Sequence, residues 1–344
     1  MKVVNLFGLY MTGKSALYDL LTERKNVFSI SPHFDLDIVR IPNGINDLIL
    51  SIQNCSVHHQ SLAIDRFLKV LYQFDSSSFG GLEKFFCQRS NYPKFFLAYK
   101  SLKMKLISEL TKDQWRCHHF HSYYSDGPLE TFTRKILLRL GRVTNNCTLY
   151  SVEKQYVINA LQEFVKNLLL SANGYRSEEL FILNNMNFVE SSHLSEHVIP
   201  NVIQYAVIRN PLDVYSSIIN SDAIHNKVPD IAIRLNRASN FDEFISGYDR
   251  QLGYLDSARI DNLTIIKFED IVADPNAILS LIEKKVQVGL RDVTQQLFYA
   301  DVSKKGVGLW KRQKDVAANS HIENKLKGYE YISKYYGNCT SDCM

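Results

Sequence analysis

The stretch Lys2–Ser15, KVVNLFGLYMTGKS, decides the fold of this chain. Its first five residues form a short apolar run typical of a buried strand, and the apolar spacing of a helix begins at Ala16. Between them lies Gly8-x-x-x-x-Gly13-Lys14-Ser15, the pattern of a phosphate-binding loop in its required place between a strand and a helix. The stretch therefore predicts a parallel α/β sheet whose first strand leads into an anion site.

The physical chemistry of anion binding explains this pattern. A loop that wraps a phosphate must turn its backbone N–H groups inward, which requires a positive φ or a close backbone approach that Gly8 and Gly13 permit. The helix that follows directs its positive end at the anion, and Lys14 adds a mobile full charge. We predict a bound phosphate or similar anion here, and the loop alone does not identify the nucleotide.

The composition indicates an ordinary globular protein. The chain has 344 residues, of which 45% are hydrophobic and 22% charged, so it is long enough for a sizeable core. We predict one α/β domain over residues 1–344, with a parallel sheet of the phosphate-loop type flanked by helices and a large helical insertion. The net charge of +4 arises without a long Lys/Arg run, which suits an anionic ligand and predicts no nucleic-acid partner.

Targeting, membrane and metal signals are weak in this sequence. It contains no apolar run of the roughly eighteen residues that a membrane span needs, and Met1 leads directly into the first strand. We therefore predict a cytoplasmic protein with no membrane partner. Six scattered cysteines are typical of free thiols in a reducing compartment. Adjacent histidines at 118–121 cannot all face one ion on a helix, so we predict no metal site.

Further strands and helices follow from the apolar spacing. We expect strands at Asn26–Ile30, Glu179–Leu183 and Val202–Ile208, and mostly helical structure from residue 45 to about residue 142. The helical block at residues 45–175 is rich in Phe, Tyr, Lys and Arg, which fits an insertion that covers a cleft and shapes an acceptor pocket. The alternative is ordinary amphipathic scaffolding.

The segment Ser31–Ile38, SPHFDLDI, supplies candidate acid/base residues. Its polar side chains alternate with apolar ones, so His33, Asp35 and Asp37 would share one face of an extended segment. In a parallel sheet this segment would end beside the phosphate loop, at the usual ligand crevice. The three residues are therefore candidates for proton transfer, and the alternative is a solvated polar face without function.

A second anion site follows the strand Val202–Ile208. Phosphate-loop ATPases usually end such a strand in Asp to hold magnesium, whereas this one is followed by Arg209. A guanidinium grips a phosphate through two hydrogen bonds, and Ser217 in the following helix offers a hydroxyl donor. Two phosphate sites, one of them without a magnesium carboxylate, describe a nucleotide phosphorylated at both ends.

With these motifs in order, the sequence resembles the sulfotransferases that use 3′-phosphoadenosine-5′-phosphosulfate (PAPS). Gly8–Leu17 looks like the family's 5′-phosphosulfate loop, and Arg209-Asn-Pro-x-Asp213-x-x-x-Ser217 looks like its 3′-phosphate motif. Leu263–Glu269 is similar to its late strand, and Ser303–Lys311 resembles its cofactor-clamping loop. Most of the family has Thr or Ser-Thr at the place of Gly13-Lys14-Ser15, and residues 45–175 match no family segment.

The resemblance implies sulfuryl transfer from PAPS to a hydroxyl or amine of a small-molecule or glycan acceptor, with release of adenosine-3′,5′-bisphosphate. Lys14 would hold the leaving oxygen, and Arg209 and Ser217 would hold the 3′-phosphate. The implied cofactor-binding residues are Tyr10, Met11, Thr12, Gly13, Lys14, Ser15, Ala16, Arg209, Ser217, Lys304, Lys305 and Gly306.

The catalytic base and the reaction class have alternatives. The cytosolic small-molecule members carry a Lys-Thr-His segment where this chain has Asn185-Met186-Asn187, so the base would be His33, Asp35 or Asp37, with Glu190 and His193 as substitutes. A magnesium-dependent kinase or NTPase is the second reading, because the first loop alone favours it; its magnesium carboxylate would come from Glu269-Asp270. A nucleotide-binding module without chemistry is the third.

Overall fold

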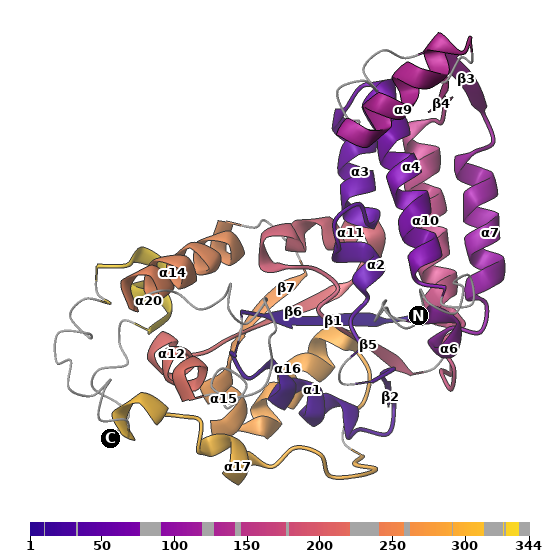
Figure 1. The fold of residues 1–344 in the computed structure, drawn as a ribbon. Helices are drawn as coiled ribbons and strands as arrows, with labels where there is room; N and C mark the ends of the chain where they lie inside the picture. The colour runs from indigo at the N-terminus through magenta and orange to yellow at the C-terminus, as the bar shows by residue number, and fades with distance from the viewer. Residues whose placement is uncertain are drawn as a thin grey trace. The chain divides into compact units, whose positions relative to one another are not determined.

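The computed structural model describes residues 1–9, 11–31, 34–75, 91–118, 127–141, 146–176, 179–220, 241–257, 262–290, 292–312, 326 and 328–336 (Figure 1). The chain divides into two compact units. Unit 1 comprises Met1–Leu36, Gly174–Glu196 and Pro200–Met344, and unit 2 comprises Asp37–Asn173 and His197–Ile199. Within these described ranges, no helix has both the length and the apolar character that crossing a membrane requires.

A sheet of five parallel strands forms the centre of unit 1. The strands lie in the order β2, β5, β1, β6, β7, and each neighbouring pair is parallel. Their bounds are β1 Val3–Gly8, β2 Val27–Phe28, β5 Leu180–Asn184, β6 Ile203–Ile208 and β7 Leu263–Lys267. The predicted α/β class with a parallel sheet flanked by helices is confirmed, and the predicted strands are present with ends shifted by one or two residues.

Strand β1 is buried on both faces of the sheet, which explains why its sequence VVNLFG is almost continuously apolar. Val4 and Leu6 belong to one core, together with side chains from α1 (Lys14–Thr22), α15 (Phe268–Ala273) and α16 (Pro275–Val286). Phe7 belongs to the other core, with α12 (Pro211–Asn220), α14 (Phe241–Ser257) and α20 (Glu330–Tyr336). Helices thus cover both faces of the sheet, as Figure 1 shows.

The strand order creates a topological switch point at the carboxyl end of β1. From β1 the chain passes through α1 to β2 and later to β5 on one side, and then enters β6 and β7 on the other side. Open parallel sheets bind ligands at such a point, outside the carboxyl ends of the strands. The described residues that follow β1 and β6, namely Leu9, Met11–Gly13 and Arg209, therefore occupy the position of a ligand site.

Unit 2 consists mainly of helices. Its elements are α2 Asp37–Arg40, α3 Ile45–Asn54, α4 Val57–Gln73, α6 Tyr92–Phe95, α7 Tyr99–Leu110, β3 Gln114–His118, α9 Pro128–Arg139, β4 Asn146–Tyr150 and α10 Lys154–Leu170. Tyr92 and Tyr99 are fully buried, and their rings meet edge to face with centroids 5.5 Å apart. A buried ion pair joins Lys103 Nζ to Asp75 Oδ2 at 2.7 Å. This core gives unit 2 its own packing centre.

One part of unit 2 differs from the helical spacing of its sequence. β3 and β4 pair as an antiparallel ribbon, with Trp115 opposite Leu149 and Cys117 opposite Cys147. Trp115 in β3 and Thr148 and Tyr150 in β4 favour strands, and the partner that makes a ribbon possible is about thirty residues away in the chain. The apolar spacing of either segment alone could not predict that the two segments pair.

The segment Ser31–Ile38 is not the alternating strand that its pattern predicts. Asp35 forms an isolated parallel bridge to Asn184 and is not part of a regular strand, and Asp37 begins α2. The Asp37 Oδ1 atom lies 2.8 Å from Nη2 of Arg40, an i,i+3 ion pair that favours helix over strand. The prediction that His33, Asp35 and Asp37 share one strand face is therefore wrong for the two aspartates, and His33 lies outside the described residues.

Candidate functional site

The loop between β1 and α1 follows a path that glycine alone accommodates at two positions. Gly13 has a φ of 81°, and a Cβ there would lie 2.2 Å from the Phe268 ring. A Cβ on Gly8 would lie 2.7 Å from both the Thr12 Oγ1 atom and the Val207 carbonyl oxygen. These distances are far below van der Waals contact, so a larger residue would displace the loop. Both glycines meet the conformational requirement that the sequence pattern predicts.

Helix α1 begins at this loop without a side-chain cap. Its N-cap residue is Gly13, and its first turn contains no acidic residue. The first N–H groups of a helix have no intrahelical partners, and they carry the positive end of the helix dipole. Lys14, the first helical residue, adds a cation at the same end. The start of α1 is thus electrostatically suited to an anion.

The other predicted loop residues have different environments. Thr12 is buried, and its hydroxyl donates to the Leu9 carbonyl oxygen at 2.8 Å, so it closes the loop internally. Met11 has a φ of 59°, a strained conformation for this residue type. Ser15 is exposed and Ala16 is buried. Tyr10 lies outside the described residues.

Arg209 ties the loops of unit 1 together. Its side chain is 6% exposed; Nη1 donates to the Met11 carbonyl oxygen at 3.1 Å and Nη2 to the Gly306 carbonyl oxygen at 2.7 Å. The guanidinium also stacks over the Phe268 ring, 4.9 Å from its centroid. Among the described residues, no hydrogen-bond partner contacts its buried Nε. Arg209 therefore connects the Gly8–Ser15 loop with the loop that contains Gly306, called the late loop below. Its Nε–H group has no acceptor among the described residues and could donate a hydrogen bond to a ligand.

Two residues fix the backbone around Arg209. The Tyr248 hydroxyl accepts from Arg209 N at 3.2 Å and donates to Arg209 O at 2.5 Å. Asn210 N donates to Glu269 Oε1 at 2.8 Å, while Glu269 Oε2 is buried without a hydrogen-bond partner in the described part of the chain. Burial raises the pKa of the Glu269 carboxyl and lowers the pKa of the Arg209 guanidinium. Each charged group partly offsets the cost of burying the other.

Asp213 holds the late loop. Its Oδ2 atom accepts from Gly308 N at 2.9 Å and its Oδ1 atom from Trp310 N at 3.1 Å, where Gly308 has a φ of 65°. Burial raises the pKa of Asp213, and these two amides together with Arg209 oppose that change. The Ser217 hydroxyl donates to the Asp213 carbonyl oxygen at 2.8 Å, an ordinary helix-internal bond. Arg209 and Asp213, which belong to the same Arg-Asn-Pro-x-Asp motif, thus both hold the late loop by hydrogen bonds.

The late loop runs from α17 (Ala300–Lys304) to the 3-10 turn Leu309–Arg312. Lys304 and Lys305 are exposed, and neither makes an ion pair with another described residue. A Cβ on Gly306 would lie 3.1 Å from Arg209 Nη2. The small residue at 306 thus lets the loop backbone approach the guanidinium, and two exposed lysines directly precede this point of approach.

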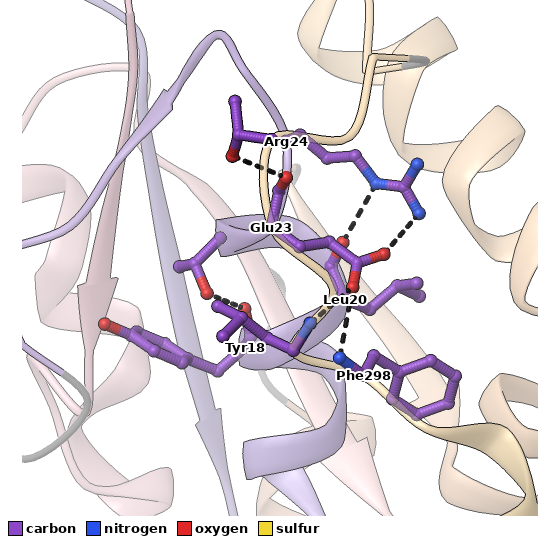
Figure 2. A network of polar contacts seen from close by, with 8 residues as sticks. Tyr18, Leu20, Glu23, Arg24 and Phe298 are labelled. Atoms are coloured by element: carbon purple, nitrogen blue, oxygen red, sulfur yellow. Dashed lines mark hydrogen bonds and ion pairs between the residues drawn. The ribbon is translucent and has the colours of Figure 1, made fainter.

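The segment that leads into the late loop is anchored at the other end of α1, where Glu23 is the central residue (Figure 2). Its Oε2 atom accepts from Phe298 N at 3.0 Å and from Leu297 N at 3.1 Å, and Oε1 pairs with Arg24 Nη2 at 2.7 Å. Its carbonyl oxygen accepts from Thr294 N at 2.9 Å. Through its carboxylate and its carbonyl oxygen, Glu23 therefore joins the end of α1 to the segment at 294–298.

Replacing Glu23 with alanine should lower the free energy of unfolding by about 3 kcal/mol, because the Leu297 and Phe298 amides and Arg24 would lose their charged partner. Chemical denaturation of the full chain measures the change. Glu330→Ala removes an exposed carboxylate from the same unit and should change stability by less than about 0.5 kcal/mol. Equal stability of the two variants would contradict this role for Glu23.

The acid/base candidates are distributed over both units. Asp35 lies at the carboxyl end of β5, where its Oδ1 atom is 3.4 Å from Asn185 Nδ2. Asp37 belongs to unit 2 and is paired with Arg40. Glu190 and His193 lie on the 3-10 helix Val189–Leu194 and are exposed. Of the candidates in the described residues, Asp35 is the carboxylate at a strand end next to β1.

Sequence reasoning missed two residues that shape this site. Phe268 contacts Gly13 and Arg209, and Tyr248 fixes the Arg209 backbone. Phe268 directly follows β7, so a search at the ends of all predicted strands would have found it. Tyr248 lies in the middle of α14, where its spacing is that of an ordinary core residue. No local signal marks it.

Comparison with known proteins adds no assignment. No family model and no curated protein sequence matches this chain. The site must therefore be interpreted from its own geometry and charges.

Proposed function

We propose that this chain is a PAPS-dependent sulfotransferase whose nucleotide lies across the carboxyl ends of β1 and β6. The observation that carries the proposal is the pairing of an uncapped helix start at Gly13-Lys14 with a buried arginine at the end of the neighbouring strand. The first feature suits the 5′-phosphosulfate and the second suits a separate phosphate. A nucleotide with phosphate groups at both ends fits this pair.

The residues present support this fit. A guanidinium has five N–H donors, and the contacts above use two of those on Arg209. Its buried Nε has no hydrogen-bond partner in the described chain, which is an unusual and costly state that an anion would relieve. Ser217 already donates within its helix, so its hydroxyl would have to rotate to donate to the 3′-phosphate. Arg209 is therefore the principal residue of the proposed 3′-phosphate site.

In the proposed reaction, PAPS supplies a sulfuryl group to an acceptor hydroxyl or amine by in-line displacement. Lys14 and the loop amides would stabilise the bridging oxygen as it leaves, and a carboxylate would remove the acceptor proton. Lys304, Lys305 and Gly306 would close over the nucleotide. Unit 2, the helical segment between β2 and β5 in the sequence, is the proposed source of acceptor-binding residues for a small molecule or glycan.

We propose Asp35 as the base, since Asp37 is paired with Arg40 within unit 2. Asp35→Asn should lower kcat by about 10²–10⁴-fold, the usual contribution of a general base, and Asp37→Asn should leave kcat within about twofold. Initial rates with PAPS and a phenolic or glycan acceptor measure both variants. A large loss for Asp37→Asn with an active Asp35→Asn variant would reverse this assignment.

A thermal-shift titration tests the proposed function. Adenosine-3′,5′-bisphosphate should raise the melting temperature by an amount that grows with the logarithm of its concentration relative to Kd, because it binds the folded state alone. AMP, which lacks the 3′-phosphate, is the matched control and should give a smaller shift at the same concentration. Stabilisation by magnesium-ATP without any response to the bisphosphate would refute the proposal.

A magnesium-dependent kinase is the second candidate. The observation in its favour is Asp35, which bridges to the end of β5 next to the strand that carries the Gly8–Ser15 loop. A carboxylate at that strand end is where phosphate-loop enzymes organise magnesium. Magnesium-dependent consumption of ATP, lost in Asp35→Asn, would support it. Tight bisphosphate binding without turnover on any acceptor would instead support a nucleotide-binding module.

A further inference from the structure

Helix α9 of unit 2 carries an apolar stripe that faces solvent. Leu129, Phe132 and Ile136 of α9 are 82%, 65% and 44% exposed, and Leu140, the residue directly after the helix, is 69% exposed. Their spacing of three, four and four residues places them within an arc of about 80° around the helix. A contiguous apolar surface of this kind is unusual on a folded protein and marks a site of interaction.

A less exposed apolar residue of α9 lies outside this stripe. Leu137 lies about 100° around the helix from the centre of the stripe, and it is half-buried. Among the described side chains of α9, Leu137 is therefore separate from the row of exposed apolar side chains. Packing within unit 2 does not account for this row.

Basic residues flank the stripe. The helix sequence PLETFTRKILLR contains Arg134, Lys135 and Arg139 against the single acid Glu130. Lys135 and Arg139 are exposed, neither makes an ion pair within the described ranges, and both lie within about 100° of the centre of the stripe. The exposed surface of α9 thus combines apolar and cationic character.

We propose that α9 docks on an anionic membrane surface. The four apolar side chains would enter the boundary between headgroups and acyl chains, and Lys135 and Arg139 would contact the anionic headgroups. A helix of 12 residues spans about 18 Å, so it would lie in the interface and not cross the bilayer. The sequence prediction of no membrane partner rested on the absence of an apolar run long enough to span a bilayer. A helix that lies in the interface does not need such a run.

Charge favours a lipid surface over a second copy of the chain. Two α9 helices that pack along the same stripe would bring the cations of each copy toward those of the other, which is unfavourable. An anionic surface neutralises the same cations. The proposal is independent of the reaction proposed for unit 1.

Co-sedimentation of the full chain with phosphatidylcholine vesicles, with and without phosphatidylserine, tests this proposal. We expect binding that requires phosphatidylserine and weakens as salt is raised. The double variant Leu129→Ser/Phe132→Ser should reduce the partition coefficient by about tenfold or more, because two exposed apolar side chains leave the acyl boundary. The matched control Leu97→Ser/Met104→Ser removes two exposed apolar side chains of unit 2 outside α9 and should bind as the unmodified chain does.

A second variant distinguishes the contribution of charge. Lys135→Glu/Arg139→Glu changes two exposed residues, should keep the melting temperature, and should abolish the preference for phosphatidylserine. The proposal is overturned if the unmodified chain does not sediment with phosphatidylserine vesicles, or if the control variant loses as much binding as the α9 variant. It is also overturned if the stripe variant changes the mass of the chain in lipid-free sedimentation equilibrium, since the stripe would then mediate self-association.

Discussion

Replacing Arg209 with methionine should abolish the response of the chain to adenosine-3′,5′-bisphosphate and also destabilise unit 1. Methionine keeps an apolar contact with Phe268 but leaves the carbonyl oxygens of Met11 and Gly306 without their donor, and it leaves Glu269 without its nearby cation. Loss of a desolvated charge that contacts phosphate typically weakens binding by about a hundredfold, and loss of a buried charge partner costs about 3 kcal/mol of stability. Thermal-shift and calorimetric titrations measure the first effect, and denaturation measures the second.

A matched variant separates these two effects. Arg24 is also a nearly buried arginine of unit 1, and it pairs with Glu23 away from the β1 and β6 strand ends. Arg24→Met should lower stability while the bisphosphate still raises the melting temperature. Arg209→Lys should restore part of the stability but little of the affinity, because an ammonium lacks the forked geometry of a guanidinium. If Arg209→Met binds the bisphosphate as tightly as the unmodified chain, Arg209 only connects the two loops by hydrogen bonds and does not bind phosphate.

Replacing Lys14 with alanine should lower kcat by about 10²–10³-fold while bisphosphate binding falls much less. The proposed role of Lys14 is to stabilise charge on the leaving oxygen, which develops only in the transition state, and the loss of one such group has this magnitude. The loop amides and the start of α1 would remain to hold the nucleotide. Rates of sulfuryl transfer from PAPS, together with bisphosphate titrations, measure the two quantities on one preparation.

The control for Lys14 is Lys284→Ala, which removes an exposed lysine from the last turn of α16 in the same unit. This variant should retain both kcat and affinity. A Lys14→Ala enzyme with unchanged kcat would refute the role in leaving-group stabilisation. A loss of affinity as large as the loss of kcat would assign Lys14 to ground-state binding of the nucleotide.

The architecture explains why the late loop belongs to the candidate site. Its entry is anchored by Glu23 at the end of α1, and its tip is held by Asp213 and Arg209. Any displacement of the tip must break hydrogen bonds to a buried carboxylate and a buried guanidinium. The late loop is therefore attached, at its entry and at its tip, to elements that also border the Gly8–Ser15 loop.

Local sequence patterns predicted the elements of unit 1 well. Apolar runs identified β1, β5 and β6. These elements are predictable because hydrophobic periodicity acts within one strand or one helix. The same reasoning failed at Ser31–Ile38, where a bridge to Asn184 and an ion pair to Arg40 replaced a regular strand. It also failed at β3 and β4, which need each other to form.

By itself, the sequence determined the parallel α/β class, because alternating strand and helix patterns are local, and it marked Gly8 and Gly13 as positions that require glycine. The tertiary structure alone decided which loops meet. Arg209 donates to Met11, 198 positions earlier, and to Gly306, 97 positions later, and Tyr248 and Phe268 complete its surroundings. The strand order of the sheet brings these residues together. No periodicity in the chain encodes that order, since it depends on which buried faces pack against each other once all the strands are present.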